Sequence, residues 1–476
     1  AGIAIANNGG QDFWGNTLSS SLPTDIGAHE NVSSTIYNGT TWSNGDPIGT
    51  TNTALDVTIE SGLITIPAAA VSSFKSLTLQ PGARISLPDD ASITTTDGLI
   101  LESTSTSFAS LDYFDGTITG PVTYKRYVAQ VGPTGTNDLI SSPVSLTDAD
   151  FDTFAATNTN LAASGTARAF APFNTASGAY ENFTVGGANT IQTAVGYRAG
   201  TTNGSVIEFI GTMGPSGPSK AISVGASSDW NLIGNPFISY LDASGWLLTN
   251  GEKLPAYFQA IYGYDGTPNG WKIINSANAN QAGNDIAPGQ GFFVKSPPAG
   301  ATINFYKFQR INAEQDDYIA GKSANENQEV YAKIQLTKND LKYTTDIYFI
   351  EDKTKGLDSG YDSGAYNGNE AALFTHLVEN NTGVAMGIQT LGFEDRNDVI
   401  VPLGVNATEG EITTIGIENS TLPNNIYVYL EDNVTNKFTL LNDGEYNFTP
   451  EKTLAGTGRF FLHFSPKALS LENNLL

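Results

Sequence analysis

The chain contains no cysteine, which excludes disulfide bonds and every metal site built on thiolates. Basic residues are also scarce, because 23 Lys and Arg stand against 48 Asp and Glu and give a formal net charge of −25. Nucleic acids and anionic membrane surfaces attract clustered Lys and Arg, so we expect no nucleic-acid partner. Unbroken apolar runs of about 18 residues are absent as well, so we expect no direct insertion into a membrane.

Residue types that carry common catalytic chemistry are few. The three histidines, His29, His376 and His463, are too far apart in the sequence to predict a metal triad. Neither a nucleophile elbow nor a phosphate-binding Gly-Lys-Ser/Thr loop occurs. A pair of catalytic carboxylates stays open, because its separation in space and not in sequence defines it. The sequence therefore leans towards a protein that is not an enzyme.

What the chain does contain is glycine, 50 residues of it, between short segments that alternate apolar and polar side chains. Residues 55–60 and 330–336 are examples of this alternation, which is typical of strands with one buried face. Helical periodicity is scarce. We therefore predict an all-β fold, with short β-solenoid or parallel β-helix segments followed by β-sandwich domains.

Turn-rich segments divide the chain into four predicted units. Short strands recur at roughly ten to twenty residues in the second unit, which is typical of a β-solenoid whose turns stack into one narrow core. The third unit holds more aromatic residues than any other unit and is predicted to be a β-sandwich. The fourth is predicted to be an antiparallel β-sandwich. The predicted bounds are 1–34, 35–128, 129–325 and 326–476.

The first unit carries a specific resemblance. Its tracts NNGGQDFWGN at residues 7–16 and DIGAHE at residues 25–30 resemble the closing coil of right-handed parallel β-helix proteins. Such helices serve adhesins and polysaccharide lyases alike, so this resemblance implies architecture and not activity. It also implies that the chain is the later part of a longer protein.

Three later motifs resemble those of large exported proteins of the Bacteroidetes. They are WNLIGNP at residues 230–236, PGQGFFV at 288–294 and GRFFLHF at 458–464. Proteins of that group are delivered by the type IX secretion system, and their C-terminal sorting domain is cleaved on export. The resemblance implies an extracellular or outer-surface location, the type IX machinery as a partner, and a sorting domain that followed the fourth unit and has been lost.

Aromatic residues in the third unit give the candidate ligand site. Turn residues place a hairpin tip between Tyr264 and Trp271, where side chains lie nearer to water. Exposed rings beside acidic and amide groups are suited to stacking on sugars, although each ring taken alone is also suited to a sandwich core. The candidate glycan-binding residues are Tyr262, Tyr264, Asp265 and Trp271.

The most concentrated acidic loop, residues 352–362, gives the candidate metal site. Alternating carboxylates and backbone carbonyls are oxygen ligands of the kind that calcium takes. The loop does not follow the EF-hand order and contains two lysines, so a solvated turn is an alternative. The candidate calcium ligands are Asp352, Asp358 and Asp362.

Two functions from different classes fit these observations. The first is a non-enzymatic extracellular surface protein, an adhesin or a structural or filament subunit that contacts glycans or neighbouring copies of itself. The second is a set of C-terminal accessory modules of a secreted polysaccharide lyase or hydrolase whose catalytic β-helix lies upstream.

Overall fold

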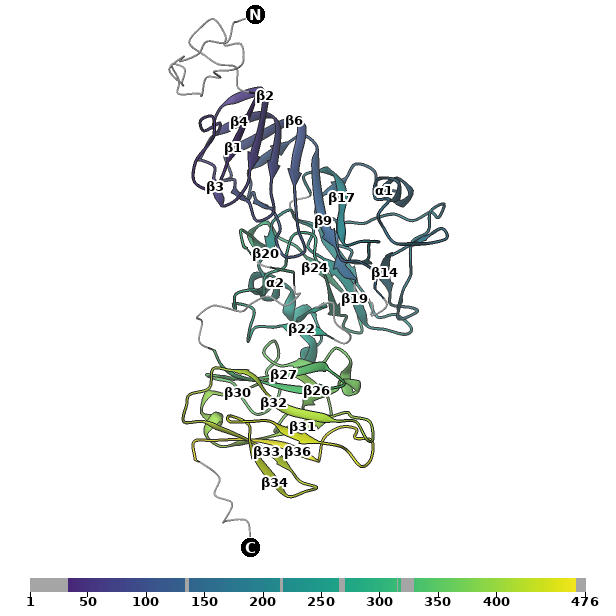
Figure 1. Cartoon of the computed structure of the whole chain (residues 1–476), viewed down its shortest axis with the longest axis vertical. Helices are drawn as coiled ribbons and strands as arrows, with labels where there is room; N and C mark the ends of the chain where they lie inside the picture. The colour runs from purple at the N-terminus through teal and green to yellow at the C-terminus, as the bar shows by residue number, and fades with distance from the viewer. Residues whose placement is uncertain are drawn as a thin grey trace, which may run out of the picture.

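The computed structural model describes residues 33–132, 137–214, 217–264, 270–314, 316–317 and 329–467. Strands dominate this part of the chain and helices are few and short, so the predicted all-β fold is confirmed. Figure 1 shows an elongated arrangement with a solenoid at one end, a middle unit, and a C-terminal unit of green and yellow strands at the other end. Within the described residues, no helix is long and apolar enough to cross a membrane.

The solenoid makes about four turns. Its larger face is a parallel sheet of β1, β2, β4, β6 and β9, and its smaller face is a parallel sheet of β3, β5 and β7. The predicted terminal coil, residues 1–34, lies outside the described residues up to residue 32, and β1 already belongs to the solenoid sheet. The strands are β1 Ser34–Tyr37, β2 Thr51–Ile59, β3 Leu63–Thr65, β4 Val71–Leu79, β5 Arg84–Ser86, β6 Ser92–Leu101, β7 Ser110–Asp112, β8 Thr117–Thr119 and β9 Val122–Val128.

Alternation along each strand builds the solenoid core. In β4, Phe74, Leu77 and Leu79 are buried, whereas Lys75 lies on the outer face and its Nζ is 3.0 Å from the Oδ2 of Asp56 on β2. One turn buries too little apolar surface to be stable alone, and stacking turns in parallel register makes the core continuous.

The middle unit, residues 129–317, continues the solenoid. Strand β17 (Ser205–Thr212) pairs antiparallel with β9, and one hydrophobic cluster extends from Leu55 in the solenoid to Ile238. The predicted boundary at 128/129 therefore does not mark a break in the sheet or in the core. The remaining elements are β10 Asp138–Ile140, β11 Ser145–Leu146, α1 Phe151–Thr157, β12 Ala163–Ser164, β13 Ala167–Arg168, β14 Phe170–Asn174, β15 Ala179–Tyr180, β16 Tyr197–Ala199, β18 Ser219–Ile222, β19 Trp230–Gly234, β20 Tyr240–Leu241, α2 Ala243–Asn250, β21 Ile261–Tyr264, β22 Trp271–Ile274, β23 Gly291–Lys295, β24 Ala301–Asn304 and β25 Arg310–Ile311, with short 3₁₀ turns at Gly251–Lys253, Ala256–Phe258 and Lys307–Gln309.

Two of the sequence motifs are neighbours in the middle unit. The strand of WNLIGNP, β19, pairs antiparallel with the strand of PGQGFFV, β23, in a four-stranded sheet ordered β19-β23-β21-β22. The buried amide of Asn235 donates to the carbonyls of Ser239, Ile286 and Ala287, which ties the two motifs together at the end of these strands. This sheet supports the aromatic hairpin β21–β22.

The C-terminal unit, residues 329–467, is built from an eleven-stranded sheet that folds over its own core. Rings of Phe349 on β27 and Phe464 on β36 meet at 5.0 Å across that core. Its strand pairings are antiparallel with one exception, the parallel pair β27 and β30. The elements are β26 Val330–Lys338, β27 Leu341–Ile350, β28 Ser363–Gly364, β29 Leu373–Thr375, β30 Met386–Gly392, β31 Val399–Val405, β32 Thr413–Ser420, β33 Tyr427–Asp432, β34 Lys437–Leu440, β35 Tyr446–Phe448 and β36 Phe460–Ser465, with 3₁₀ turns at Gly368–Glu370 and Phe393–Asn397.

Candidate functional site

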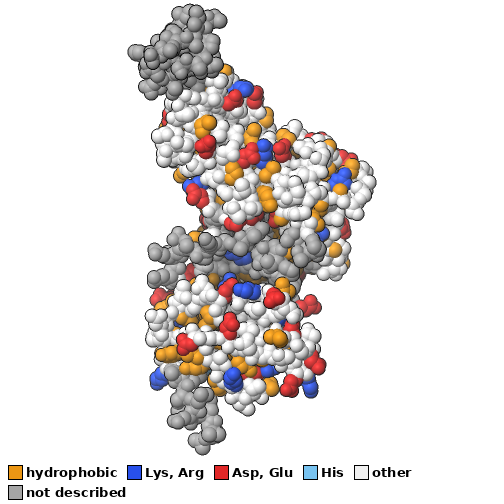
Figure 2. All heavy atoms as spheres, in the orientation of Figure 1, with side chains coloured by type: hydrophobic (Ala, Val, Ile, Leu, Met, Phe, Trp, Pro, Cys, Tyr) orange, Lys and Arg blue, Asp and Glu red, His pale blue; other side chains and the backbone are white. Residues whose placement is uncertain are grey.

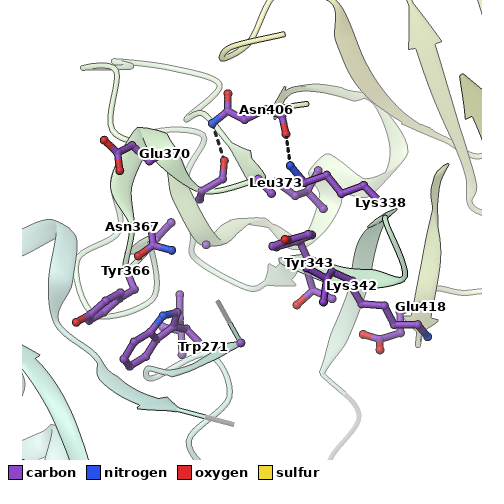
Figure 3. Close-up of a pocket in the computed structure, with 18 of the residues that line it drawn as sticks. Trp271, Lys338, Lys342, Tyr343, Tyr366, Asn367, Glu370, Leu373, Asn406 and Glu418 are labelled. Atoms are coloured by element: carbon purple, nitrogen blue, oxygen red, sulfur yellow. Dashed lines mark hydrogen bonds between the residues drawn. The ribbon is translucent and has the colours of Figure 1, made fainter. Parts of the chain in front are cut away.

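A cleft of about 720 Å³ lies where the middle unit meets the C-terminal unit. Strand β22 supplies Trp271 and Ile273, and Gly270 directly precedes it. The C-terminal unit supplies the rest of the lining, from the β26–β27 hairpin, the segment 365–373 after β28, Gly387 on β30, Asn406 and β32. Figure 3 shows Trp271 and Tyr366 together on one side, with Lys342 and Tyr343 on another. This volume is in the range of about 300 to 1,000 Å³ that is usual for small-molecule sites.

Stacked aromatic rings form one wall of the cleft. The ring centroids of Trp271 and Tyr366 are 3.7 Å apart with an interplanar angle of 17°. Trp230 stacks on Tyr366 at 4.5 Å, and the edge of Phe293 meets Trp271 at 5.7 Å. Trp271 and Tyr366 are partly exposed and line the cleft, and the stack fixes their orientation. Tyr366 lies between Trp230 and Trp271, so both of its ring faces are covered and it meets the cleft with its edge.

The loop before β28 positions Tyr366. The carboxylate of Asp362 is fully buried and accepts from the backbone N–H of Asp358 and of Thr390, each at 2.6 Å. Burial raises the pKa of Asp362 to about 7, against the lowering effect of these hydrogen bonds. This carboxylate therefore fastens the loop to β30, four residues before the ring of Tyr366.

Hydrogen bonds join the two units beside the aromatic wall. The hydroxyl of Tyr262 donates to the carbonyl of Gly364 at 2.8 Å, and the amide of Asn275 donates to the hydroxyl of Ser363 at 2.9 Å. A side chain at Gly364 would place its Cβ 2.6 Å from the ring of Phe258, so the two units approach each other as closely as glycine permits. The cleft thus sits on a tightly packed junction.

Charged side chains line the opposite wall. Lys333 lies 3.6 Å from Glu418, and its pKa is raised, chiefly by the facing carboxylate of Asp346. The Nζ of Lys338 donates to the carbonyl of Asn406 at 3.0 Å. Behind the wall, burial lowers the pKa of Lys272 to about 8, and its Nζ donates to the carbonyl of Gly283.

The predicted glycan residues have three different placements. Trp271 lines the cleft, and Tyr264 lies beside it with ring centroids 5.5 Å apart. Tyr262 is fully buried, so its ring face is not available to a ligand, and the interpretation of this residue as a sugar contact is corrected to a role in joining the units. Asp265 lies outside the described residues.

The predicted calcium loop is held by its own hydrogen bonds. Asp362 is buried as described above, and Asp358 accepts from the backbone N–H of Thr354 at 2.7 Å. Asp352 is exposed and adopts a left-handed backbone conformation with φ of 60°. Within the described residues, no group of three or more His, Cys, Asp or Glu is arranged to hold a metal ion. Calcium binding by these three residues stays a prediction.

Sequence reasoning missed Tyr366, Tyr343 and the lysines of the β26–β27 hairpin. Tyr366 follows a loop with no periodicity, and its partners Trp230 and Trp271 are more than ninety residues away in the sequence. Its place four residues after the acidic loop was the one available signal. The structure brings the two predicted sites, the aromatic hairpin and the acidic loop, to the same junction.

Comparisons with known proteins give one match. No curated protein and no solved structure matches the chain. A family model matches residues 30–464, so it spans the solenoid, the middle unit and the C-terminal unit together. The chain belongs to the family described as a domain of unknown function (DUF8693).

Proposed function

We propose that the protein is a non-enzymatic component of the outer cell surface that contacts glycans through the cleft between its middle and C-terminal units. The observation that carries this proposal is the wall formed by Trp271 and Tyr366 beside a polar wall of lysines, carboxylates and amides. Flat rings pack against the apolar face of a pyranose, and polar side chains at the rim bind its hydroxyl groups.

The extracellular part of the proposal is supported by the sequence. WNLIGNP and PGQGFFV resemble motifs of exported Bacteroidetes proteins, and the type IX machinery is the delivery route that this resemblance suggests. A formal charge of −25 on a cysteine-free chain suits a large β protein that stays dispersed by self-repulsion.

The rigidity of the site supports a binding role. Aromatic stacking and hydrogen bonds across the junction hold Trp271 and Tyr366 before any ligand arrives. Preorganised side chains lose little conformational entropy on binding, which benefits a weak ligand such as a sugar. Of the three acids at the cleft, Glu418 is already engaged with Lys333, so it is poorly placed to act as a free acid or base.

Retardation in native gels that contain soluble polysaccharides tests this function on the full chain. We expect retardation by at least one polysaccharide and a loss of about tenfold or more in affinity for Trp271→Ala. Phe308→Ala is a matched control, since Phe308 is exposed at 50% and does not line the cleft. Loss of binding in the control with retention in Trp271→Ala would place the ligand elsewhere and contradict the proposal.

Location is tested separately on the cells that produce the protein. Brief protease treatment of intact cells should remove the protein from an outer-surface site, whereas a periplasmic reference protein survives. Protection of the protein in intact cells, with digestion only after lysis, would contradict the extracellular location.

A further inference from the structure

The charges that line the cleft cancel, although the protein as a whole is strongly acidic. The lining contains three lysines and three acidic residues, namely Lys333, Lys338, Lys342, Asp340, Glu370 and Glu418. On the face shown in Figure 2, acidic and basic side chains are likewise interspersed among polar surface. The cleft is therefore not a local centre of positive charge.

Two of the three lysines are already engaged. The Nζ of Lys333 lies 3.6 Å from Glu418, and that of Lys338 lies 3.7 Å from Glu411 and donates to the carbonyl of Asn406. Among the described residues, Lys342 forms no ion pair, and neither do Asp340 and Glu370. The charges left over are therefore one positive and two negative.

A binding site for a polysaccharide built from uronates needs an excess of unpaired positive charge. Each sugar of such a chain carries a carboxylate, and recognition of carboxylates relies on unpaired Arg or Lys, best in a bidentate arrangement. The described part of the cleft wall contains no arginine. The net charge of −25 adds a long-range repulsion between the protein and any polyanion.

Resting on the proposed function, we infer that the ligand of this cleft is an uncharged glycan and not a polyuronate. Trp271 packs against the apolar face of one sugar. Glu370 and Asp340 accept hydrogen bonds from hydroxyl groups, and Lys342 and the exposed amide of Asn367 donate to them. Side chains of both signs suit hydroxyl groups, because a hydroxyl both donates and accepts.

This assignment disfavours one of the functions that the sequence left open, the accessory modules of a lyase. Polysaccharide lyases cleave polymers of uronates, so accessory modules of a lyase are expected to bind anionic chains. A cleft for an uncharged glycan favours a surface protein that adheres to neutral polysaccharide, or an accessory module of a hydrolase of such polymers.

The test compares neutral and anionic polysaccharides on the full chain in native gels. The neutral probes are laminarin, xylan and mannan, and the anionic probes are alginate and polygalacturonate. We expect retardation by a neutral probe and little change in it with added salt. Trp271→Ala and the milder Tyr343→Ala should each weaken that retardation, with circular dichroism confirming that both variants fold.

Each outcome decides between the two proposals. Stronger retardation by alginate or polygalacturonate that salt and Lys342→Glu abolish would overturn the neutral-glycan inference and leave glycan binding in place. No retardation by any probe, or neutral binding that both folded cleft variants retain in full, would overturn glycan binding at this cleft itself.

Discussion

At the scale of single residues, Gly364 controls how closely the two units approach. A Cβ there would lie 2.6 Å from Cε1 of Phe258, and that ring is held by Trp230 and by the Nζ of Lys295 3.8 Å from its centre. We expect Gly364→Ala to lower the free energy of unfolding by about 1–3 kcal/mol, because overpacking forces the junction to shift. Urea unfolding followed by tryptophan fluorescence measures the loss.

Gly444→Ala is the matched control for this prediction. No atom lies within 4 Å of a Cβ at Gly444, so the same substitution there meets open space. Equal stability of the two variants would contradict the close approach at Gly364.

Residues of the candidate site differ in how far the sequence reveals them. Turn chemistry around Trp271 indicated a ring near the surface, and the structure places it at the cleft. The same reasoning gave Tyr262 the same role, although Tyr262 lies in a run of three buried residues on β21 and its hydroxyl bonds across the junction to Gly364. Tyr366 had no local signal, since its position depends on contacts between units.

At the scale of elements, the acidic loop before β28, residues 352–362, holds Tyr366 in position at the cleft. Burial raises the pKa of Asp362 to about 7 from an ordinary 3.8, so the folded protein holds a proton that the unfolded chain releases. The stability from this group is therefore fully present below about pH 4 and is lost as the pH rises through about 7. Urea midpoints of the unmodified protein measured from pH 4 to pH 8 should include this decline.

Asp362→Asn removes the titrating group and should remove this part of the pH dependence. Its amide also turns a donor towards the backbone N–H of Asp358 or of Thr390, which destabilises the variant at every pH. Asp90→Asn changes an exposed carboxylate of the solenoid and serves as the control. Parallel stability curves for Asp362→Asn and the unmodified protein would contradict the role given to this carboxylate.

The sequence predicts individual strands, because the alternation of apolar and polar residues is local. It does not predict which strands pair with one another. The alternation in β2, β4 and β26 is visible in the sequence because each strand buries one face. The pairing of β9 with β17 joins residues about eighty positions apart, and nothing in either strand specifies its neighbour. For that reason the predicted boundary at 128/129 falls inside one continuous sheet.

At the scale of the whole molecule, residues 305–314 and 316–317 form a strap that returns from the middle unit to the solenoid. Arg310 lies 3.7 Å from the ring centre of Tyr113 and donates to the carbonyl of Phe114. The amide oxygen of Asn312 accepts from the hydroxyl of Ser110 at 3.4 Å. These contacts join segments that are about 200 positions apart in the sequence.

The strap ends on a buried ion pair between Asp317 and Arg126, and this pair carries the last prediction. Arg126 is fully buried on β9, with Phe108 under its guanidinium at 4.2 Å. Asp317→Ala leaves that charge buried without its partner, so we expect a loss of about 3–5 kcal/mol in the free energy of unfolding. Replacing both residues by apolar ones, Arg126→Met with Asp317→Leu, should recover only part of it, because the buried carboxylate of Asp138 then loses the nearby charge of Arg126. Glu314→Ala breaks the neighbouring but exposed pair with Arg84 and should cost less than about 1 kcal/mol. Urea unfolding that finds Asp317→Ala no more destabilising than Glu314→Ala would mean that the strap does not depend on the buried pair.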